Sequence, residues 1–567
     1  MIAPRAAAAL ALAAVLAVLA LAPAPARAGS DLAHAAPATG LEPYRESLHV
    51  SQLPDGKVFA LFSFDRTIRL GFPDGRHTTH YGLMPRSIGE VFQAFDVREL
   101  HLTFTQGRWD LDRWGHSPAS APSGVELWAW LNSTNVDAKW KGLTNALAGL
   151  FCASLNFIDQ AVTTEPLLSF DPEGDISRKS GFQIRYGSLP REAVCTENLT
   201  PWAKLLPCQT KSGIADLLNA YRIFDGNFQS MGVHLTPKCA TPDCSDTIFE
   251  FRQTFAVVLD NERINARRDW SFQTLFQRHI HTTCPFAAST TVHLHLNKLE
   301  HESVYILPTA NAFSDTPTSI DRYFTVTQTP FFLDVHWEPE NLNSRNPRLA
   351  PVKTHRYLSG VGQERGAIVV DFTNDLPTPM RATYFDSIPF ILKMYLHTLR
   401  VVQRAGGNES TDASGIVRET FFQPAMDRLR PNVLELSLVL PPKSKTTISI
   451  DFDCTFLKYT EHHPDANHGF ELGVGVLTLE SNPFPPISDP ESAAATPPDQ
   501  PVRIYTESLL VRLPTPDFSM PYNVITLTCT LLALFFGSVF NMLTRGLRPV
   551  PIAGKSLLDR FRRSRKA

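Results

Sequence analysis

The sequence LPTPDFSMPYNVITLTCTLLALFFGSVFNMLTRGLR occupies residues 513–548 and decides how the chain is organised. Residues 524–544 include no charged side chain. At about 1.5 Å per residue, a helix of this length crosses a hydrocarbon core of about 30 Å. We therefore predict a transmembrane helix at 524–544, with a juxtamembrane segment at 513–523 before it and a basic tail at 545–567 after it.

The two ends of the chain predict its orientation in a membrane. The tail carries eight basic residues against one aspartate, and such segments stay on the cytosolic side. Residues 1–28 contain Arg5, an apolar run and the small-residue pattern Ala26-Arg27-Ala28, which indicates a cleavable signal peptide. A retained signal anchor is the alternative. We expect a single-pass type I membrane protein whose bulk is lumenal.

The part between the signal and the span is long enough for two or three domains. The whole chain is 43% hydrophobic and 19% charged, values typical of a folded protein. Without the signal and the basic tail its formal net charge is −12. Such an acidic body argues against a nucleic-acid partner.

The cysteine count is odd on the lumenal side. Cys529 lies within the predicted span, which leaves seven lumenal cysteines: Cys152, Cys195, Cys208, Cys239, Cys244, Cys284 and Cys454. In an oxidising compartment an odd number indicates a free thiol, a buried reduced cysteine or a bond to another chain. Cys239 and Cys244 are close enough in sequence to close a small loop.

Three sequons are consistent with a secretory-pathway lumen: Asn132-Ser-Thr, Asn198-Leu-Thr and Asn408-Glu-Ser. We expect glycosylation at Asn132, Asn408 and Asn198. Asn198 is the weakest acceptor of the three, because Pro201 follows the sequon and cysteines flank it.

Alternating apolar residues predict short strands in most of the lumenal chain, for example at 57–66, 125–131 and 445–452. One amphipathic helix is expected at 136–158, where apolar residues recur every three or four positions. The fold class is therefore mainly β, with antiparallel β-sandwich-like lumenal domains, a few helices and one C-terminal transmembrane helix. We expect one β-rich domain at 29–290 and a second at 291–512.

The sequence contains no GxSxG, HExxH, P-loop or GxGxxG motif. The usual signatures of hydrolases, metalloproteases and nucleotide-binding enzymes are therefore missing. His293 and His295 alternate on a predicted strand and would share one face, as two metal ligands do. No acidic or thiol partner stands at ligand spacing, so an exposed polar sheet face is the favoured interpretation of His293 and His295, and of His279 and His281 as well. No cofactor is expected.

Polar residues precede the span at the depth of the lipid headgroups. Asp517 would pair with an amine there, and Ser519 and Asn523 would hydrogen-bond sugar hydroxyls or phosphate, which suits an amine-bearing glycolipid. The alternative is the polar start of a helix, with Asp517 or Ser519 as its cap and Pro521 in its first turn. The residues by themselves favour the helix start.

Six segments resemble the PIG-T family of glycosylphosphatidylinositol (GPI) transamidase subunits. They occur in the family's order along nearly the whole chain: FCASLNFID at 151–159, CTENLTPW at 195–202, RYLSG at 356–360, QPAMDRLRP at 423–431, DANHGF at 465–470 and LPTPDFSMPYNVITLTCT at 513–530.

The resemblance implies a non-catalytic subunit of the endoplasmic reticulum complex that attaches GPI anchors to proprotein C-termini. Its implied partners are a caspase-like catalytic subunit, multi-span subunits, the GPI glycolipid and the proprotein substrate, and no nucleic acid. The cysteine that opens CTENLTPW, Cys195, would form a disulfide with the catalytic subunit. Asn467, Asp517, Ser519 and Asn523 would contact the glycolipid, so the resemblance reverses the preference for a plain helix start.

Two other classes of protein are the alternatives to a transamidase subunit. A lumenal hydrolase would have to turn over substrate as an isolated ectodomain. A type I cargo receptor would need a sorting signal in the tail, and RSRKA lacks lysines at the usual dilysine spacing.

Overall fold

The structure is a computed structural model that describes residues 43–68, 81–132, 134–178, 181–241, 244, 247–265, 267–298, 302–338, 350–360, 362–405, 408–410, 415–462, 465, 467–483, 501–515, 517 and 519–547. The expected signal peptide at 1–28 lies outside these residues. So does the tail beyond residue 547.

The first part of the chain forms a ten-stranded sheet in the order β11-β12-β9-β1-β2-β7-β6-β3-β4-β5. Its neighbouring strands are antiparallel except for β1 and β9, which are parallel. The strands are β1 Tyr44–Gln52, β2 Val58–Ile68, β3 Val97–Gln106, β4 Gly124–Asn132, β5 Phe182–Leu189, β6 Phe228–Cys239, β7 Thr247–Leu259, β9 Ser289–Asn297, β11 Ala312–Asp315 and β12 Ser319–Thr325.

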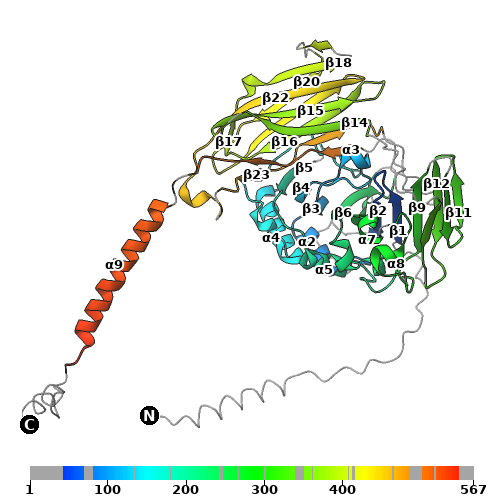
Figure 1. Cartoon of the computed structure of the whole chain (residues 1–567), viewed down its shortest axis with the longest axis horizontal. Coiled ribbons are helices and arrows are strands. Elements are labelled where there is room, and N and C mark those ends of the chain that lie inside the picture. The colour runs from blue at the N-terminus through cyan, green and yellow to red at the C-terminus, as the bar shows by residue number, and fades with distance from the viewer. Residues whose placement is uncertain are drawn as a thin grey trace, which may run out of the picture. The chain divides into compact units, whose positions relative to one another are not determined.

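Helices cover one face of this sheet (Figure 1). The main ones are α2 Arg86–Ala94, α4 Val136–Phe151, α5 Thr196–Lys204 and α8 Phe272–Phe276. Short turns of helix occur at η1 Leu155–Phe157, η2 Ile214–Leu217, α6 Ala220–Ile223 and α7 Asn261–Asn265. The short helix α3 Leu111–Trp114 instead packs against Phe59 and Phe228 on the opposite face of the sheet. The predicted helix at 136–158 is thus confirmed as far as Phe151, where Cys152 adopts a left-handed backbone conformation and ends it.

Strand β4 shows how the two faces of the sheet differ. Leu127, Ala129 and Leu131 face the helical layer and belong to its core. Trp128 and Trp130 alternate with them and belong to a separate cluster on the opposite face. All but the last residue of β4 are therefore buried, although the sequence VELWAWL alternates as a half-exposed strand would.

The second part of the chain is a two-sheet β-sandwich. One sheet has the order β14-β15-β22-β18-β19, with β17 also paired to β22, and the other has the order β20-β21-β16-β24-β25. The strands are β14 Val352–Ser359, β15 Arg365–Asn374, β16 Met380–Ile388, β17 Leu392–Met394, β18 Arg400–Ala405, β19 Asn408–Ser410, β20 Val417–Gln423, β21 Asn432–Leu440, β22 Ser444–Cys454, β24 Val476–Leu479 and β25 Val502–Tyr505. Residues such as Val370, Leu436 and Ile450 alternate inward and form its core.

The sandwich contacts the uncovered face of the first sheet. Phe385, Val433 and Val476 of the sandwich cluster with Trp128 and Trp130. The fully buried carboxylate of Glu435 accepts hydrogen bonds from the backbone amides of Leu167, Leu168 and Ser169 at 2.5 to 2.8 Å. Three donors converging on one carboxylate compensate for its desolvation.

Polar contacts extend this interface. Arg503 on β25 pairs with Glu173 and lies over the Trp128 ring. The Tyr505 hydroxyl donates to Glu126 at 2.9 Å. Burial raises the pKa of Glu126, because the charged carboxylate is poorly solvated there.

The division between the two parts falls later than the sequence indicates. Strands β9, β11 and β12 complete the first sheet, and a three-stranded sheet of β10 Ser303–Leu307, β13 Asp334–Glu338 and β8 Trp270–Ser271 adds to its core. The expected boundary at 290/291 lies inside β9, and the observed one follows Glu338. Parallel pairing of β9 with the distant β1 causes the difference.

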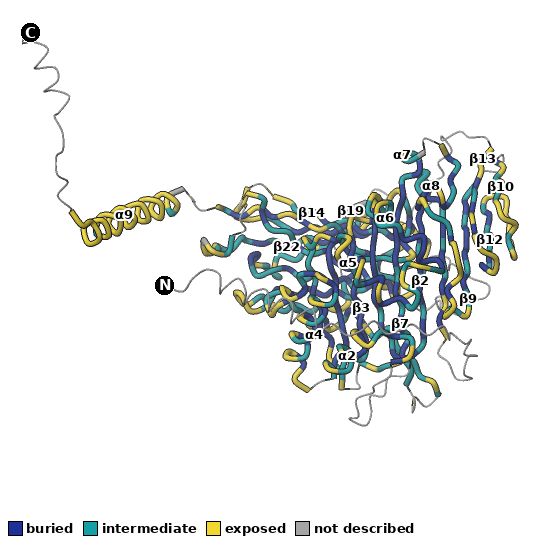
Figure 2. The backbone as a smooth tube through the Cα atoms, turned by 90° about the horizontal axis from the view of Figure 1, so that it is seen from below, coloured by how far each residue is buried: buried dark blue, intermediate teal, exposed yellow. Residues whose placement is uncertain are grey.

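The last helix, α9 Ser519–Thr544, begins at Ser519 rather than at Val524 as predicted. Its residues 520–544 are long and apolar enough to cross a membrane and none is buried within the protein (Figure 2). The hydroxyls of Thr526, Thr528 and Thr530 donate to backbone carbonyls one turn earlier at 2.7 to 2.8 Å. These threonines therefore meet their hydrogen-bonding needs within the helix, as a lipid environment requires.

Candidate functional site

Cys195 lies at the N-terminus of α5, where it is the N-cap residue. Its backbone N–H donates to the side-chain oxygen of Asn198 at 2.9 Å, and its sulfur lies 3.5 Å from the same oxygen. This is a capping arrangement, which satisfies backbone groups that a helix end otherwise leaves unpaired. The thiol is half-buried and not disulfide-bonded.

Asn198 also connects two segments that the sequence singled out separately. Its side-chain nitrogen donates to the carbonyl oxygens of Phe151 and Cys152 at 3.0 and 3.2 Å. The end of α4 and the start of α5 are thereby held together, and Cys152 is exposed beside them. The segments 151–159 and 195–202 therefore form one structural unit around a single amide.

The C-terminal half of α5 is fixed by Trp202. Its ring is fully buried and its indole N–H donates to the Gly232 carbonyl at 3.0 Å. Its own carbonyl accepts from the side chain of Gln253, which in turn accepts from the buried Arg66. Burial lowers the pKa of Arg66 to about 10. The helix that carries Cys195 thus cannot shift without breaking buried hydrogen bonds.

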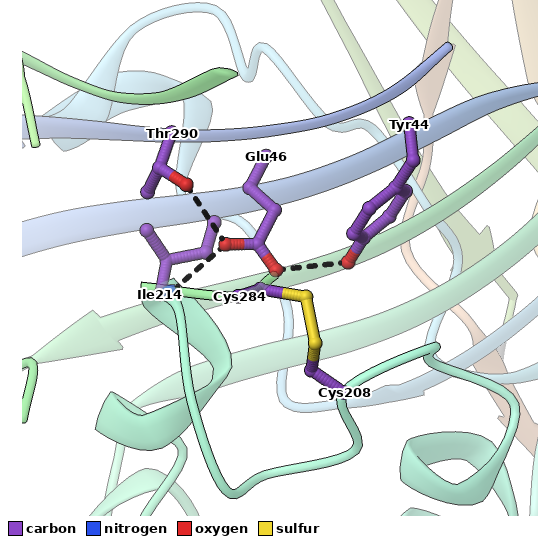
Figure 3. Close-up of a disulfide and its surroundings, with 6 residues drawn as sticks. All are labelled: Tyr44, Glu46, Cys208, Ile214, Cys284 and Thr290. Atoms are coloured by element: carbon purple, nitrogen blue, oxygen red, sulfur yellow. Dashed lines mark hydrogen bonds between the residues drawn. A yellow bond between two sulfur atoms is a disulfide. The ribbon is translucent and has the colours of Figure 1, made fainter. Parts of the chain in front are cut away.

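A disulfide between Cys208 and Cys284 ties the chain after α5 to the segment that precedes β9 (Figure 3). Beside it, the buried Glu46 carboxylate accepts from the Tyr44 hydroxyl at 2.9 Å and from the Ile214 backbone N–H at 3.2 Å. The Thr290 hydroxyl donates a third hydrogen bond to this carboxylate, at 3.3 Å (Figure 3). Burial raises the pKa of Glu46, and these donors favour its charged form.

The disulfides account for four of the seven cysteines before the span. The expected small loop between Cys239 and Cys244 is present. Among the described residues, Cys152, Cys195 and Cys454 remain as thiols. The odd count therefore reflects three unbridged cysteines among the described residues.

The three sequons differ in their surroundings. Asn132 ends β4 and is partly exposed, and Asn408 begins β19. Asn198 is only 2% exposed and its amide is fully engaged in the contacts described above. Since a glycan needs an accessible amide, burial argues against Asn198 as an acceptor.

A two-stranded ribbon forms the base from which the chain leaves for α9. Strand β23 Phe470–Leu472 pairs antiparallel with β26 Leu509–Val511, with Phe470 opposite Val511. Gly469 has a φ of 92°, and a Cβ there would lie 2.6 Å from the Val511 carbonyl oxygen, so only glycine fits. Asn467 lies two residues before Gly469, whose backbone packs against Val511 and Arg512.

The four candidate glycolipid ligands lie along this exit. Asn467 is exposed, and its backbone N–H donates to the Asp465 carboxylate at 3.2 Å in a tight turn. Asp517 is exposed between β26 and α9. Ser519 and Asn523 lie one turn apart on α9, hence on one side of the helix. Pro521 lies in the first turn, as the alternative of a polar helix start also requires.

Arg356, from the segment RYLSG, is a buried residue whose role the sequence does not reveal. Its guanidinium pairs with Asp386 at 3.0 Å and donates to the Gly473 carbonyl at 2.5 Å. Burial raises the pKa of Asp386. Gly473 directly follows β23, so Arg356 anchors the ribbon to the sandwich.

The contacts of the histidines on β9 are with an aspartate and with another histidine. His293 and His295 share one face of β9 as expected, and both contact the Asp321 carboxylate, at 3.3 and 2.8 Å. His293 also contacts His49 at 3.0 Å between ring nitrogens. No cluster of His, Cys, Asp and Glu with metal-binding geometry occurs among the described residues.

Comparison with known proteins identifies the family. A family described as "Gpi16 subunit, GPI transamidase component" matches residues 31–269 and 263–563. The chain belongs to the Gpi16 family.

Relatives of this Gpi16-family chain are similar along most of their length. GPI-anchor transamidase component PIGT of Homo sapiens is 37% identical over 537 residues, which cover 88% of this chain and 90% of the human protein. GPI transamidase component GPI16 of Saccharomyces cerevisiae is 30% identical over 578 residues, 91% of each chain. The chain is accordingly a GPI transamidase subunit, as the six sequence segments predict.

Solved structures add nothing to this assignment. The collagen-binding domain of Erysipelothrix rhusiopathiae surface protein RspB aligns with 83% of this Gpi16-family chain and 93% of that domain. Its TM-score of 0.19 and identity of 8% are too low to support an argument.

Proposed function

We propose that this subunit is non-catalytic, and that it braces a caspase-like catalytic subunit while it holds the GPI glycolipid for attachment to proprotein C-termini. Family membership and the position of Cys195 carry the proposal. The thiol sits at the start of a helix that is fixed by Asn198 and Trp202, so a bond to it would transmit a defined geometry.

The membrane-proximal residues would supply the second fixed point. An ethanolamine ammonium suits the Asp517 carboxylate, and the side chains of Asn467, Ser519 and Asn523 suit sugar hydroxyls and phosphate. Their common position along the chain's exit to α9 supports this assignment.

Positioning explains how such a subunit would accelerate transamidation. Acyl transfer requires a thioester, the ethanolamine amine and the peptide to meet in near-attack geometry. Holding the reactants in this geometry lowers the activation free energy, by about 7 to 11 kcal/mol in well-oriented intramolecular reactions. One subunit that fixes both the protease and the lipid would provide part of that advantage.

The proposed disulfide between Cys195 and the catalytic subunit is tested with Cys195→Ser in the assembled complex. We expect the heavier band of the wild type on a non-reducing gel to disappear, with activity lowered but not abolished. Cys454→Ser is the matched control and should keep the band. If the wild type shows no heavier band, the proposed disulfide between the subunits does not exist.

The lipid contact is tested with Asp517→Ala. We expect retention of GPI by the purified complex to fall more than recovery of the other subunits. Equal loss of both would assign Asp517 a structural role.

The proposed setting is the endoplasmic reticulum membrane, with a cleaved signal, a lumenal bulk and glycans at Asn132 and Asn408. The basic tail and the sequons support this orientation. Glycosidase treatment of the full chain should lower its apparent mass, and Asn132→Gln with Asn408→Gln should abolish the shift.

A further inference from the structure

A group of exposed apolar side chains lies at one end of the sandwich. The proposed function gives these side chains no role. Met426 and Leu429 are 47% and 53% exposed in the turn between β20 and β21, and Phe456 is 87% exposed just after β22. We call these three residues the apolar tip. Exposing a large aromatic side chain this fully to water is unfavourable, by about 25 cal/mol for each Å² of apolar surface.

Side-chain and backbone contacts bring the two segments of the tip together. Arg428, between Met426 and Leu429, makes a two-pronged ion pair with Glu461 and lies over the Phe390 ring, 5.6 Å from its centre. The Phe390 carbonyl accepts from the Thr455 hydroxyl, and Thr455 immediately precedes Phe456. Both segments therefore contact the same residue, Phe390, one through its ring and the other through its carbonyl.

The tip is also continuous with the chain's exit toward α9. His462, next to Glu461, contacts the Phe470 ring at 6.3 Å between ring centres. Phe470 is opposite Val511 in the ribbon, and Leu513 is the last residue buried in the sandwich core before the span. The short stretch from 514 to 518 reaches at most about 3.5 Å per residue, so the tip lies near the level at which α9 meets the bilayer.

We propose that the apolar tip inserts into the headgroup region of the bilayer and makes a second membrane contact beside α9. The occupant is lipid because the patch is joined through residue contacts to a segment that is long and apolar enough to span a membrane. Other exposed aromatic residues, such as Tyr221 and Phe313, lie on the first sheet system and not beside the exit.

Charges around the tip limit how far it enters. Asp427 and Lys458 are exposed beside it, and both would remain hydrated at the headgroup level. Arg428 is neutralised by Glu461, and this pairing lowers the pKa of Glu461 to about 2. The contact is therefore interfacial, and it would restrict rotation of the sandwich about the single helix. This inference needs only that α9 crosses a membrane and does not depend on the proposed function.

The experiment replaces Phe456 by the photoreactive p-benzoylphenylalanine in the full chain, within membranes that contain an alkyne-bearing phosphatidylcholine. After irradiation we expect the chain to carry several-fold more lipid label than the same chain with the photoreactive residue at Phe313, which is 72% exposed. A photoreactive residue at Leu429 is the second position, and it should label as Phe456 does.

Each outcome decides the proposal. Cross-linking of position 456 to another protein chain would make the tip a protein-binding surface and would overturn it. Lipid labelling at 456 and 429 that does not exceed labelling at 313 would overturn it as well. Phe456 is almost fully exposed, so its replacement leaves the folded core intact.

Discussion

The region around Cys195 and the region around Asn467 and Asp517 are built in opposite ways. Cys195 is held by an amide that also bonds Phe151 and Cys152, by a buried tryptophan and by a nearby disulfide. Asn467 is held by one tight turn on a ribbon of three residue pairs, and Asp517 is exposed. Independent buried contacts thus fix the first region, whereas backbone pairing with one buried anchor shapes the second.

The difference suits the two partners that we propose. A disulfide to another protein subunit transmits geometry only if its own base is rigid. A headgroup at a bilayer surface presents several polar atoms that exposed side chains can meet by adjusting their rotamers.

Removing the anchor of the ribbon should cost the most. Arg356→Met leaves the Asp386 carboxylate buried without its partner, and we expect a loss of about 3 to 5 kcal/mol in the free energy of unfolding. Chemical denaturation of the purified full chain measures it. Arg381→Met, at a residue 67% exposed, is the control and should change stability by less than about 0.5 kcal/mol. Equal effects of the two variants would show that the ribbon has no buried anchor.

Loss of the shared amide should affect the Cys195 region next. Asn198→Ala removes the cap of α5 and leaves the Phe151 and Cys152 carbonyls without their donor, at an expected cost of about 1 to 3 kcal/mol. We also expect slower formation of the proposed disulfide, measured by non-reducing gel after a reducing pulse. A variant that loses stability but forms the bond at the wild-type rate would separate Asn198 from the positioning of Cys195.

The buried side of the first sheet should respond to acid. Burial lowers the pKa of His234 to about 3, so the unfolded chain, with a pKa near 6.5, takes up the proton first. The stability that this residue contributes is complete above pH 6.5 and falls as the pH decreases, by about 1.4 kcal/mol between pH 7.5 and 5.5.

His234→Gln should flatten the pH dependence of unfolding by that amount, and thermal unfolding at the two pH values checks it. An unchanged slope in His234→Gln would mean that the ring is hydrated in the folded chain.

The smallest effect on stability is expected at the membrane side. Asn467→Ala removes an exposed side chain, and we expect it to change the free energy of unfolding by less than about 0.5 kcal/mol. If the proposed function holds, GPI retention should still fall. A stability loss comparable to that of Asn198→Ala would erase the contrast between the two regions.

Local patterns predicted most elements of the fold, because alternation and helical periodicity depend on nearby residues only. The strands at 125–131 and 445–452 and the helix at 136–151 appear where the pattern places them. The boundary after Glu338 was missed because it depends on β9 pairing with β1, which no local pattern encodes. The apolar run predicted α9 only from Val524 onward, whereas its start at Ser519, with Pro521 in the first turn, agrees with the alternative of a polar helix start.

The candidate sites follow the same division. Sequence identified Cys195 and the residues near the span through family resemblance, but not their supports. Asn198 was interpreted as a glycan acceptor, although its spacing from Cys195 is that of a capping residue at the third helical position. Glu435 could not have been found, because its partners are backbone amides of a distant segment.

The parallel pairing of β1 and β9 affects folding during synthesis, because the two strands are far apart in the sequence. His49 meets His293 across 244 positions, so the first strand to leave the ribosome stays unpaired on that edge until the ninth has been made. Contacts this distant in sequence slow folding and prolong the exposure of apolar edges. The disulfide between Cys208 and Cys284 cannot form until residue 284, just before β9, has been made, so Cys208 depends on the lumenal folding machinery until then.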